Sequence, residues 1–193
     1  MTQLPNSALA EIFSTVGAGV RARRPPDGMQ TRIIAIDGLG GAGKSSLAER
    51  LSAALDGAEI VHTDDFASWD NPLDWWPELI EQLLVPLSQN RTARFKRSRW
   101  TEEERGWAEV RPAAFVILEG VTASRKAFRS YLTYSIWVEA PPELRMRRGL
   151  ERDGDDARAQ WESWMAGEEN YRTTEYPHER ADFVVRGDRD LWS

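Results

Sequence analysis

Residues 31–47 read TRIIAIDGLGGAGKSSL, and this stretch decides the fold. Residues 33–36 form a short, continuous apolar run, which predicts a strand buried on both faces. Residues 44–55 repeat apolar side chains at helical spacing, which predicts an amphipathic helix. A glycine-rich loop connects the two elements. The order of strand, glycine loop and helix is typical of an α/β fold.

The loop matches the pattern Gly-x-x-x-x-Gly-Lys-Ser, which is formed by Gly38, Gly43, Lys44 and Ser45. Glycines allow the backbone to curl so that successive N–H groups point at phosphate oxygens, and the start of the helix adds the positive end of its dipole. Lys44 is expected to reach the β- and γ-phosphates of ATP, and the Ser45 hydroxyl to ligate Mg2+. A glycine-rich turn without a ligand is the alternative. The predicted phosphate-binding residues are Gly38, Gly40, Gly41, Ala42, Gly43, Lys44, Ser45 and Ser46.

Length and composition narrow the class of protein. The 193 residues suffice for one domain, so a single domain over residues 1–193 is expected. The 31 acidic and 25 basic residues give a formal net charge of -6, so no nucleic acid partner is expected. The absence of cysteine excludes disulfides and thiolate chemistry. Neither a signal peptide nor a run of ~20 apolar residues is present, which predicts a cytoplasmic protein without a membrane partner, either a monomer or a homo-oligomer.

Further apolar runs predict four more strands, at residues 59–62, 115–118, 134–138 and 182–185. They alternate with helical segments, which include residues 144–152 and 157–171, and this alternation implies parallel pairing with right-handed crossovers. Residues 1–28 are expected to form an N-terminal helix and a linker. Residues 69–112, with a helix near 75–87 and a charged segment at 91–111 without clear periodicity, are interpreted as an insertion over the site. The nine tryptophans are expected to pack at the edges of the core, with base stacking as the alternative.

Acidic residues end two of the predicted strands. Asp64 and Asp65 follow one strand, and Glu119 ends the next. In an open parallel sheet the ligand lies beyond the carboxyl ends of the strands. One of these carboxylates can act as a general base for an acceptor hydroxyl, and another can hold Mg2+. A turn or a helix cap is the alternative role for the Asp64–Asp65 pair, and Glu119 is equally open to a structural role.

Arginines cluster on one predicted helix and its exit loop. Arg145, Arg148 and Arg152 are three and four residues apart and therefore share a face, and Arg158 follows Gly154. A mobile arginine lid at residues 145–158 would neutralise a phosphoryl group during transfer. A solvated helix face is the alternative.

Taken together, residues 31–187 resemble the uridine kinase-like group of P-loop kinases, which includes nicotinamide riboside, pantothenate and phosphoribulose kinases. Besides the glycine loop, the resemblance rests on HTDDF at residues 62–66, ILEG at 117–120, LRMRRGLERD at 144–153 and ADFVVRG at 181–187. It implies the P-loop NTPase fold, a five-stranded parallel sheet flanked by helices, with ATP as donor and a small-molecule hydroxyl as acceptor. It also implies that Asp64 is the base, and that Arg148 and Arg152 are lid residues that contact phosphates, with Arg158 nearby.

The chain departs from this family where the acceptor would bind. Ala67 stands where uridine kinases have a tyrosine, and Arg99 where they have an aspartate that binds the ribose hydroxyls. An arginine cannot accept hydrogen bonds from hydroxyls and prefers an anion. Basic residues of the insertion are therefore predicted to bind an acidic or phosphorylated acceptor, with a solvated basic hairpin as the alternative. The predicted acceptor-binding residues are Asp64, Asp65, Phe66, Arg94, Arg99, Trp100, Glu119 and Arg145.

The predicted function is transfer of the γ-phosphoryl group of ATP to a hydroxyl of a small, nucleoside-like metabolite. Lys44, Asp64, Arg148 and Arg152 are the predicted catalytic residues. Ser45, Glu119 and Asp64 are the predicted Mg2+-binding residues, and Arg152 and Arg158 are expected to contact ATP. Two alternatives remain, a nucleoside monophosphate kinase and an ATP-binding regulatory module without transfer activity.

Overall fold

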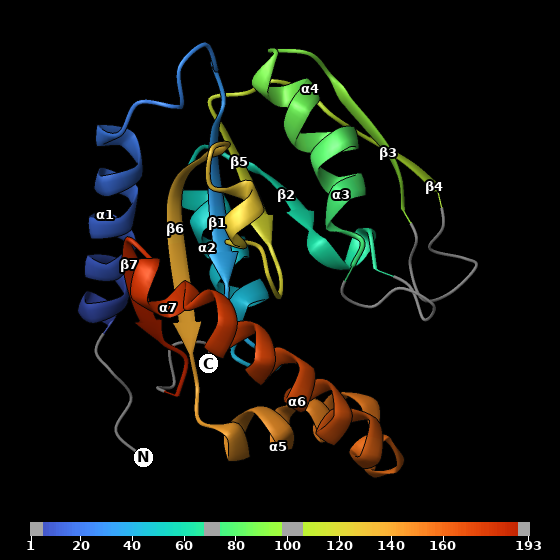
Figure 1. Ribbon diagram of the computed structural model, residues 1–193. Helices are drawn as coiled ribbons and strands as arrows, with labels where there is room; N and C mark the ends of the chain where they lie inside the picture. Colours follow the sequence, from blue (N-terminus) through green and yellow to red (C-terminus); the bar gives the residue numbers. More distant parts are fainter. Residues whose placement is uncertain (1–5, 68–73, 98–105, 189–193) are drawn as a thin grey trace.

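Five parallel strands form the central sheet in the computed structural model, in the order β2–β5–β1–β6–β7 (Figure 1). The structure describes residues 6–67, 74–97 and 106–188. All five strands predicted from the sequence are confirmed, as is their parallel pairing. Their bounds are β1 (Arg32–Asp37), β2 (Glu59–His62), β5 (Phe115–Glu119), β6 (Leu132–Glu139) and β7 (Phe183–Arg186).

Helices cover both faces of the sheet. The helices α1 (Asn6–Ala22) and α2 (Lys44–Ala54) cover one face, and α3 (Trp76–Leu79) and α4 (Val85–Ser88), joined by a π-helical turn at Ile80–Leu84, cover the other. Along β1, Ile34 and Ile36 belong to the core beneath α1 and α2, whereas Ile33 and Ala35 belong to the core beneath α3 and α4. The apolar run in β1 is therefore buried on both faces, as its composition predicted.

Two further helices lie beyond the carboxyl ends of the strands, and a third, short helix precedes β7. Figure 1 shows β1 and β6 pointing their carboxyl ends toward α5 (Pro142–Asp153) and α6 (Arg158–Glu175), while the short α7 (Pro177–Arg180) leads into β7. The two longer helices were predicted from the sequence at residues 144–152 and 157–171, and both are longer in the structure. No helix in the described ranges is long and apolar enough to cross a membrane.

The segment at residues 91–111 contains an antiparallel pair of strands, β3 (Ala93–Arg97) and β4 (Gly106–Val110). The expectation that this segment lacks periodicity was wrong. Ala93 and Phe95 are buried against the α3–α4 side of the core, whereas Arg94 and Lys96 face solvent. The hairpin lies beside α3 and α4, beyond the β2 edge of the sheet (Figure 1).

Candidate functional site

The glycines of the loop between β1 and α2 are required by close packing. Gly38 and Gly41 have φ angles of 150° and 75°, which side-chain-bearing residues rarely adopt. A Cβ atom on Gly38 would lie 2.4 Å from the carbonyl oxygen of Val138, and one on Gly41 would lie 2.6 Å from that of Arg145. The loop therefore packs directly against the backbone of β6 and α5.

The first turn of α2 presents backbone donors to a cavity. Gly43 precedes the helix in the left-handed conformation, and no side chain from the described residues caps the turn. The first amide groups of a helix have no intrahelical acceptor, so those of Lys44, Ser45 and Ser46 remain for an anion. These three residues line a cavity of about 500 Å³, within the range of ~300–1,000 Å³ typical of small-molecule sites.

Part of the loop is occupied by contacts within the protein. The side chain of Lys44 is buried, and its Nζ donates to the carbonyl oxygen of Leu39 at 3.2 Å. Three of the predicted phosphate-binding residues also use their N–H groups internally, which leaves the N–H groups of Gly41, Gly43 and the first turn of α2 for phosphate. These three are Gly38, Gly40 and Ala42, which donate to Asp37 Oδ1 (2.7 Å), Glu168 Oε1 (2.9 Å) and Leu39 O (3.2 Å).

Asp37 holds the start of the loop in place. Its fully buried carboxylate accepts hydrogen bonds from the N–H groups of Gly38, Thr122 and Ser124, and from the hydroxyls of Ser124 and Tyr171, both at 2.6 Å. Burial raises the pKa of Asp37, and the hydrogen bonds from Ser124 and Tyr171 oppose this effect. Asp37 was not among the residues predicted for the site, although an acidic residue at the end of a wholly apolar run indicates a buried polar contact.

A buried ion pair supports the loop from α5 and α6. Arg145 Nη1 lies 3.1 Å from Glu168 Oε2 and 3.5 Å from the carbonyl oxygen of Gly40, and both side chains are almost fully buried. Burial raises the pKa of Glu168, while the charges of Lys44 and Arg145 oppose this shift. Glu168 lines the cavity and was not identified from the sequence. Arg145 does not line the cavity, so its predicted contact with the acceptor needs correction: its guanidinium is occupied by the ion pair.

Two carboxylates lie beside the loop in the same cavity. Glu119 is buried, with Oε2 at 2.7 Å from His62 Nδ1 and Oε1 at 3.4 Å from Ser45 Oγ. Burial alone would raise the pKa of Glu119, but the hydrogen bond from His62 and the charge of Lys44 outweigh it and lower the pKa. Asp64 keeps an open face toward the cavity. The surrounding protein desolvates its carboxylate and so raises its pKa, and the charge of Lys44 partly offsets that rise.

The Ser45 hydroxyl and the Glu119 carboxylate fit Mg2+. Both are hard oxygen donors, and they are adjacent in the cavity. Mg2+ is commonly bound by one or two protein oxygens together with water and substrate phosphates. Within the described ranges, no group of three or more acidic or histidine side chains could hold a metal without such help. The arrangement therefore suits a metal held jointly by the protein and a phosphate chain.

Of the four arginines named for the predicted lid, Arg148 and Arg152 line the cavity, whereas Arg145 and Arg158 do not. Arg148 Nη1 donates to the carbonyl oxygen of Gly41 at 3.2 Å, and Arg152 pairs with Asp153 at 2.7 Å. The guanidinium of Arg152 also lies 5.6 Å from the ring centre of Trp161, which packs against the loop. Arg158 lines a separate cavity beside α5, so the predicted contact between Arg158 and ATP is absent from this arrangement.

The far wall of the cavity is largely apolar. Ala67, Trp75 and Val121 line it, together with the ring of His62. Phe66, a predicted acceptor-binding residue, is instead buried in the core, where its ring stacks on Trp75 and lies 4.7 Å from that of Phe95.

The remaining predicted acceptor-binding residues lie away from the cavity or outside the described ranges. Asp65 is buried and lies 3.6 Å from Arg97 Nε. Arg94 lies over the ring of Trp107 and 3.7 Å from Glu109, on the hairpin. Neither Asp65 nor Arg94 lines the cavity. Arg99 and Trp100 lie outside the described residues.

The arrangement of strand, glycine loop, helix and lysine at the carboxyl ends of a parallel sheet defines a P-loop protein. Comparison with protein families agrees with this class. The family described as an AAA domain matches residues 34–176, and the chain belongs to this family. No curated protein matches the sequence.

Solved structures share the fold over almost the whole chain. A protein from Bacillus stearothermophilus, described as a "possible uridine kinase", has a TM-score of 0.67 at 20% identity, covering 92% of this chain and 99% of the other. A protein from Silicibacter sp. TM1040, described as a "putative fructose transport system kinase", has a TM-score of 0.63 at 21% identity, covering 92% and 98%. At these identities the comparison shows that the chain shares the P-loop NTPase fold of these proteins.

Proposed function

We propose that the protein is a Mg2+- and ATP-dependent kinase that phosphorylates a hydroxyl group of a small metabolite. The observation that carries this proposal is the sharing of one cavity by the glycine loop, the Ser45–Glu119 pair and Asp64. The glycine loop suits the binding of the phosphates, the Ser45–Glu119 pair suits the binding of Mg2+, and Asp64 suits the removal of a proton from the acceptor. The likeness in fold to proteins described as kinases supports the same class.

In this proposal the amide groups of Gly41, Gly43 and the first turn of α2 bind the phosphates, and Lys44 leaves Leu39 to contact the transferred group. Mg2+, when bound by Ser45 and Glu119, would offset negative charge on the phosphate chain. Arg148 and Arg152 would stabilise the charge that develops during transfer, because both line the cavity beside the loop. We propose residues 145–158 as the lid and residues 69–112 as the acceptor-binding insertion of a single domain over residues 1–193.

Asp64 is the proposed general base. Its carboxylate faces the cavity, and its raised pKa brings its proton affinity closer to that required for accepting a proton near neutral pH. The proton of the acceptor hydroxyl would move to an Oδ atom of Asp64 as the oxygen attacks the γ-phosphorus. The bond from the γ-phosphorus to the β–γ bridging oxygen would break, and ADP would leave with that oxygen. Glu119 suits the metal instead, because its lowered pKa keeps it ionised.

The acceptor is proposed to be neutral and nucleoside-like at the end that enters the cavity. Trp75 and Ala67 offer an apolar wall for a flat or apolar group. The two arginines of the described part of the hairpin, Arg94 and Arg97, lie near Glu109 and Asp65 and do not line the cavity. This placement favours a hydroxyl acceptor over a nucleoside monophosphate.

The test is a screen of purified protein with ATP, Mg2+ and a metabolite panel, in which phosphorylated products are identified by mass and ADP release is measured. Cytidine and its monophosphate form a matched pair of acceptors that separates the two kinase classes. Once an acceptor is identified, Lys44→Ala and Asp64→Asn should both abolish transfer, and only Lys44→Ala should greatly weaken ATP binding. Full turnover by Asp64→Asn would remove Asp64 from the role of base, and tight ATP binding without acceptor-stimulated ADP release would favour a regulatory module.

A further inference from the structure

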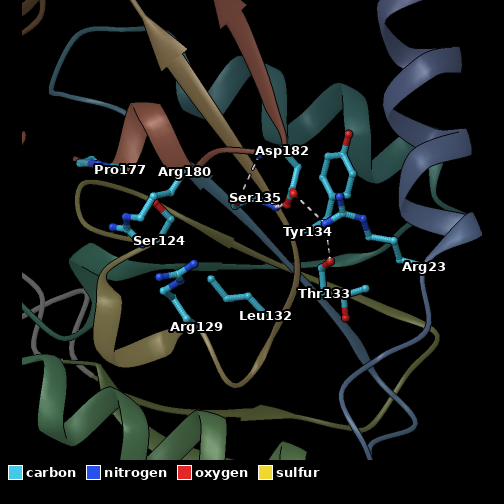
Figure 2. Close-up of a pocket in the computed structure, with 10 residues that line it drawn as sticks. All are labelled: Arg23, Ser124, Arg129, Leu132, Thr133, Tyr134, Ser135, Pro177, Arg180 and Asp182. Carbon is cyan, nitrogen blue, oxygen red and sulfur yellow. Dashed lines mark hydrogen bonds and ion pairs between the residues drawn. The ribbon is translucent and has the colours of Figure 1, made fainter. Parts of the chain in front are cut away.

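A second pocket lies at the amino-terminal half of β6, and it shares no lining residue with the candidate active site. Its walls come from β6, α7, the residues before β1, and residues 124–129 (Figure 2). The pocket has a volume of about 140 Å³. This is less than the ~300 Å³ of a small-molecule site but several times the ~30 Å³ that a water molecule occupies in the liquid. Its size suits a small ion or one charged group of a larger ligand.

One side of this pocket carries positive charge that the protein does not neutralise fully. Arg129 forms no ion pair with the described parts of the chain. Arg180 Nη2 is buried without a hydrogen-bond partner there, and its nearest carboxylate oxygen, on Glu175, is 3.8 Å away. Glu175 also faces Arg125 at 3.8 Å, so a single carboxylate serves two guanidinium groups. Figure 2 shows Arg129 and Arg180 on the same side of the pocket, next to Ser124.

The charged groups on the other side of the pocket are already paired. Arg23 lies 2.7 Å from Asp182, whose carboxylate also accepts hydrogen bonds from the N–H (2.8 Å) and hydroxyl (3.1 Å) groups of Ser135. Asp182 is therefore committed to Arg23 and Ser135, on the opposite side from Arg129 and Arg180 (Figure 2). The hydroxyl of Ser124 donates to Asp37 and is not available as a donor to a ligand. The charged donors that remain for a ligand are the guanidinium groups of Arg129 and Arg180, although Arg180 Nε already donates to the carbonyl oxygen of Glu175 at 2.9 Å. The buried hydroxyl of Thr133, which also lines the pocket, has no hydrogen-bond partner in the described part of the chain.

We propose that this pocket binds a phosphate group, held between Arg129 and Arg180. Guanidinium groups present several N–H donors in a fixed plane that matches the oxygens of phosphate, and their charge is permanent. A protein with a formal net charge of -6 has no general attraction for anions, so an incompletely neutralised pair of arginines in a pocket indicates a specific site. This site is independent of the kinase proposal, because it lies outside the cavity of the glycine loop.

The test titrates inorganic phosphate into the full-length chain and measures binding by calorimetry. The titration is made in the wild-type chain and in the Lys44→Ala variant, in which phosphate binding by the glycine loop is weakened. We expect saturable binding that Arg129→Gln and Arg180→Gln each weaken at least fivefold. Arg129→Lys should have a smaller effect, since it keeps the charge and loses the planar group. The matched control Arg91→Gln removes an exposed arginine elsewhere and should leave the affinity unchanged.

Two further ligands distinguish the sources of the phosphate group. Glycerol 3-phosphate that binds more tightly than inorganic phosphate would identify the ligand as a phosphorylated metabolite, and the reverse order would identify the free ion. Three results would contradict the proposal. They are the absence of phosphate binding, binding of acetate as tightly as phosphate, and equal affinities for phosphate in the arginine variants and in the control. Thermal unfolding without ligand checks each variant, and Arg129→Gln decides the outcome if Arg180→Gln fails to fold, because Arg129 is exposed.

Discussion

Replacing Gly41 by alanine tests the packing of the glycine loop against α5, and Gly57 provides a matched control. The two glycines have nearly identical φ angles, +75° for Gly41 and +77° for Gly57. An alanine in this conformation costs about 1 kcal/mol at either position. At Gly57 the new Cβ would meet no atom within 4 Å, so this strain is the whole expected effect.

At Gly41 the same Cβ would also overlap with backbone. It would lie 2.6 Å from the carbonyl oxygen of Arg145 and 2.9 Å from its Cα, and neither atom can move without shifting α5 or the loop. Overpacking of this kind costs about 1–3 kcal/mol. The total for Gly41→Ala is therefore about 2–4 kcal/mol, against about 1 kcal/mol for Gly57→Ala.

Thermal unfolding and nucleotide titration measure the two consequences. In a protein of this size 1 kcal/mol corresponds to about 2–4 °C in Tm, so we expect a loss of about 2–4 °C for Gly57→Ala and about 5–15 °C for Gly41→Ala. Affinity for ATP with Mg2+ should fall at least tenfold in Gly41→Ala, because the loop amides are displaced, and stay unchanged in Gly57→Ala. Equal losses of Tm together with unchanged ATP affinity in both variants would refute the reasoning.

Substitutions of Asp64, Arg152 and Glu168 also test the site, and Arg158→Gln serves as a control. If Asp64 is the base, acceptor phosphorylation should fall at acid pH with a midpoint above 3.8, the ordinary pKa of aspartate, because burial raises the pKa of Asp64. The same shift means that the folded state binds this proton more tightly than the unfolded state. Asp64→Asn should therefore be at least as stable as wild type at pH 7 and should lose that advantage below pH 3.8. Measuring the Tm of both proteins across this pH range tests the prediction. Arg152→Gln should lower kcat about 100-fold if Arg152 stabilises developing charge, whereas Arg158→Gln, in a separate cavity, should leave steady-state kinetics unchanged. Glu168→Ala should lower stability by about 3 kcal/mol in denaturant unfolding, since it removes the acceptor atoms for Arg145 and for the N–H group of Gly40 and leaves the buried guanidinium without its partner; a loss below about 1 kcal/mol would show that the pair does not support the loop.

The sheet was predictable because its strands are buried on both faces. Each reads as a short run of apolar residues, and all five lie within two residues of their expected bounds. A hairpin was only the alternative interpretation of residues 91–111, and its strands were not predicted, although Ala93 and Phe95 alternate with Arg94 and Lys96 in the period-two pattern of a half-buried strand. The segment is highly charged and only a few side chains show the alternation of apolar and charged residues, so the pattern is weak in the sequence.

The candidate site was predictable where it depends on local sequence. The glycine loop, Asp64 and Glu119 follow directly from the chain order of strand ends, and they share the cavity. The roles of Glu168 and Arg145 could not be read in this way, because their pairing joins two helices across 23 residues and depends on how those helices pack. The same reason applies to Arg158, since its distance from the cavity is set by the turn that separates α5 from α6.

The most direct test of the central claim is a titration of ATP, with and without Mg2+, into the purified full-length chain, followed by calorimetry. The account expects one saturable site whose affinity rises with Mg2+, because Ser45 and Glu119 would hold the metal together with the phosphates. Lys44→Ala should lower that affinity severely. Absence of binding by ATP and by every other nucleoside triphosphate in the presence of Mg2+, in a chain shown to be folded, would contradict the account.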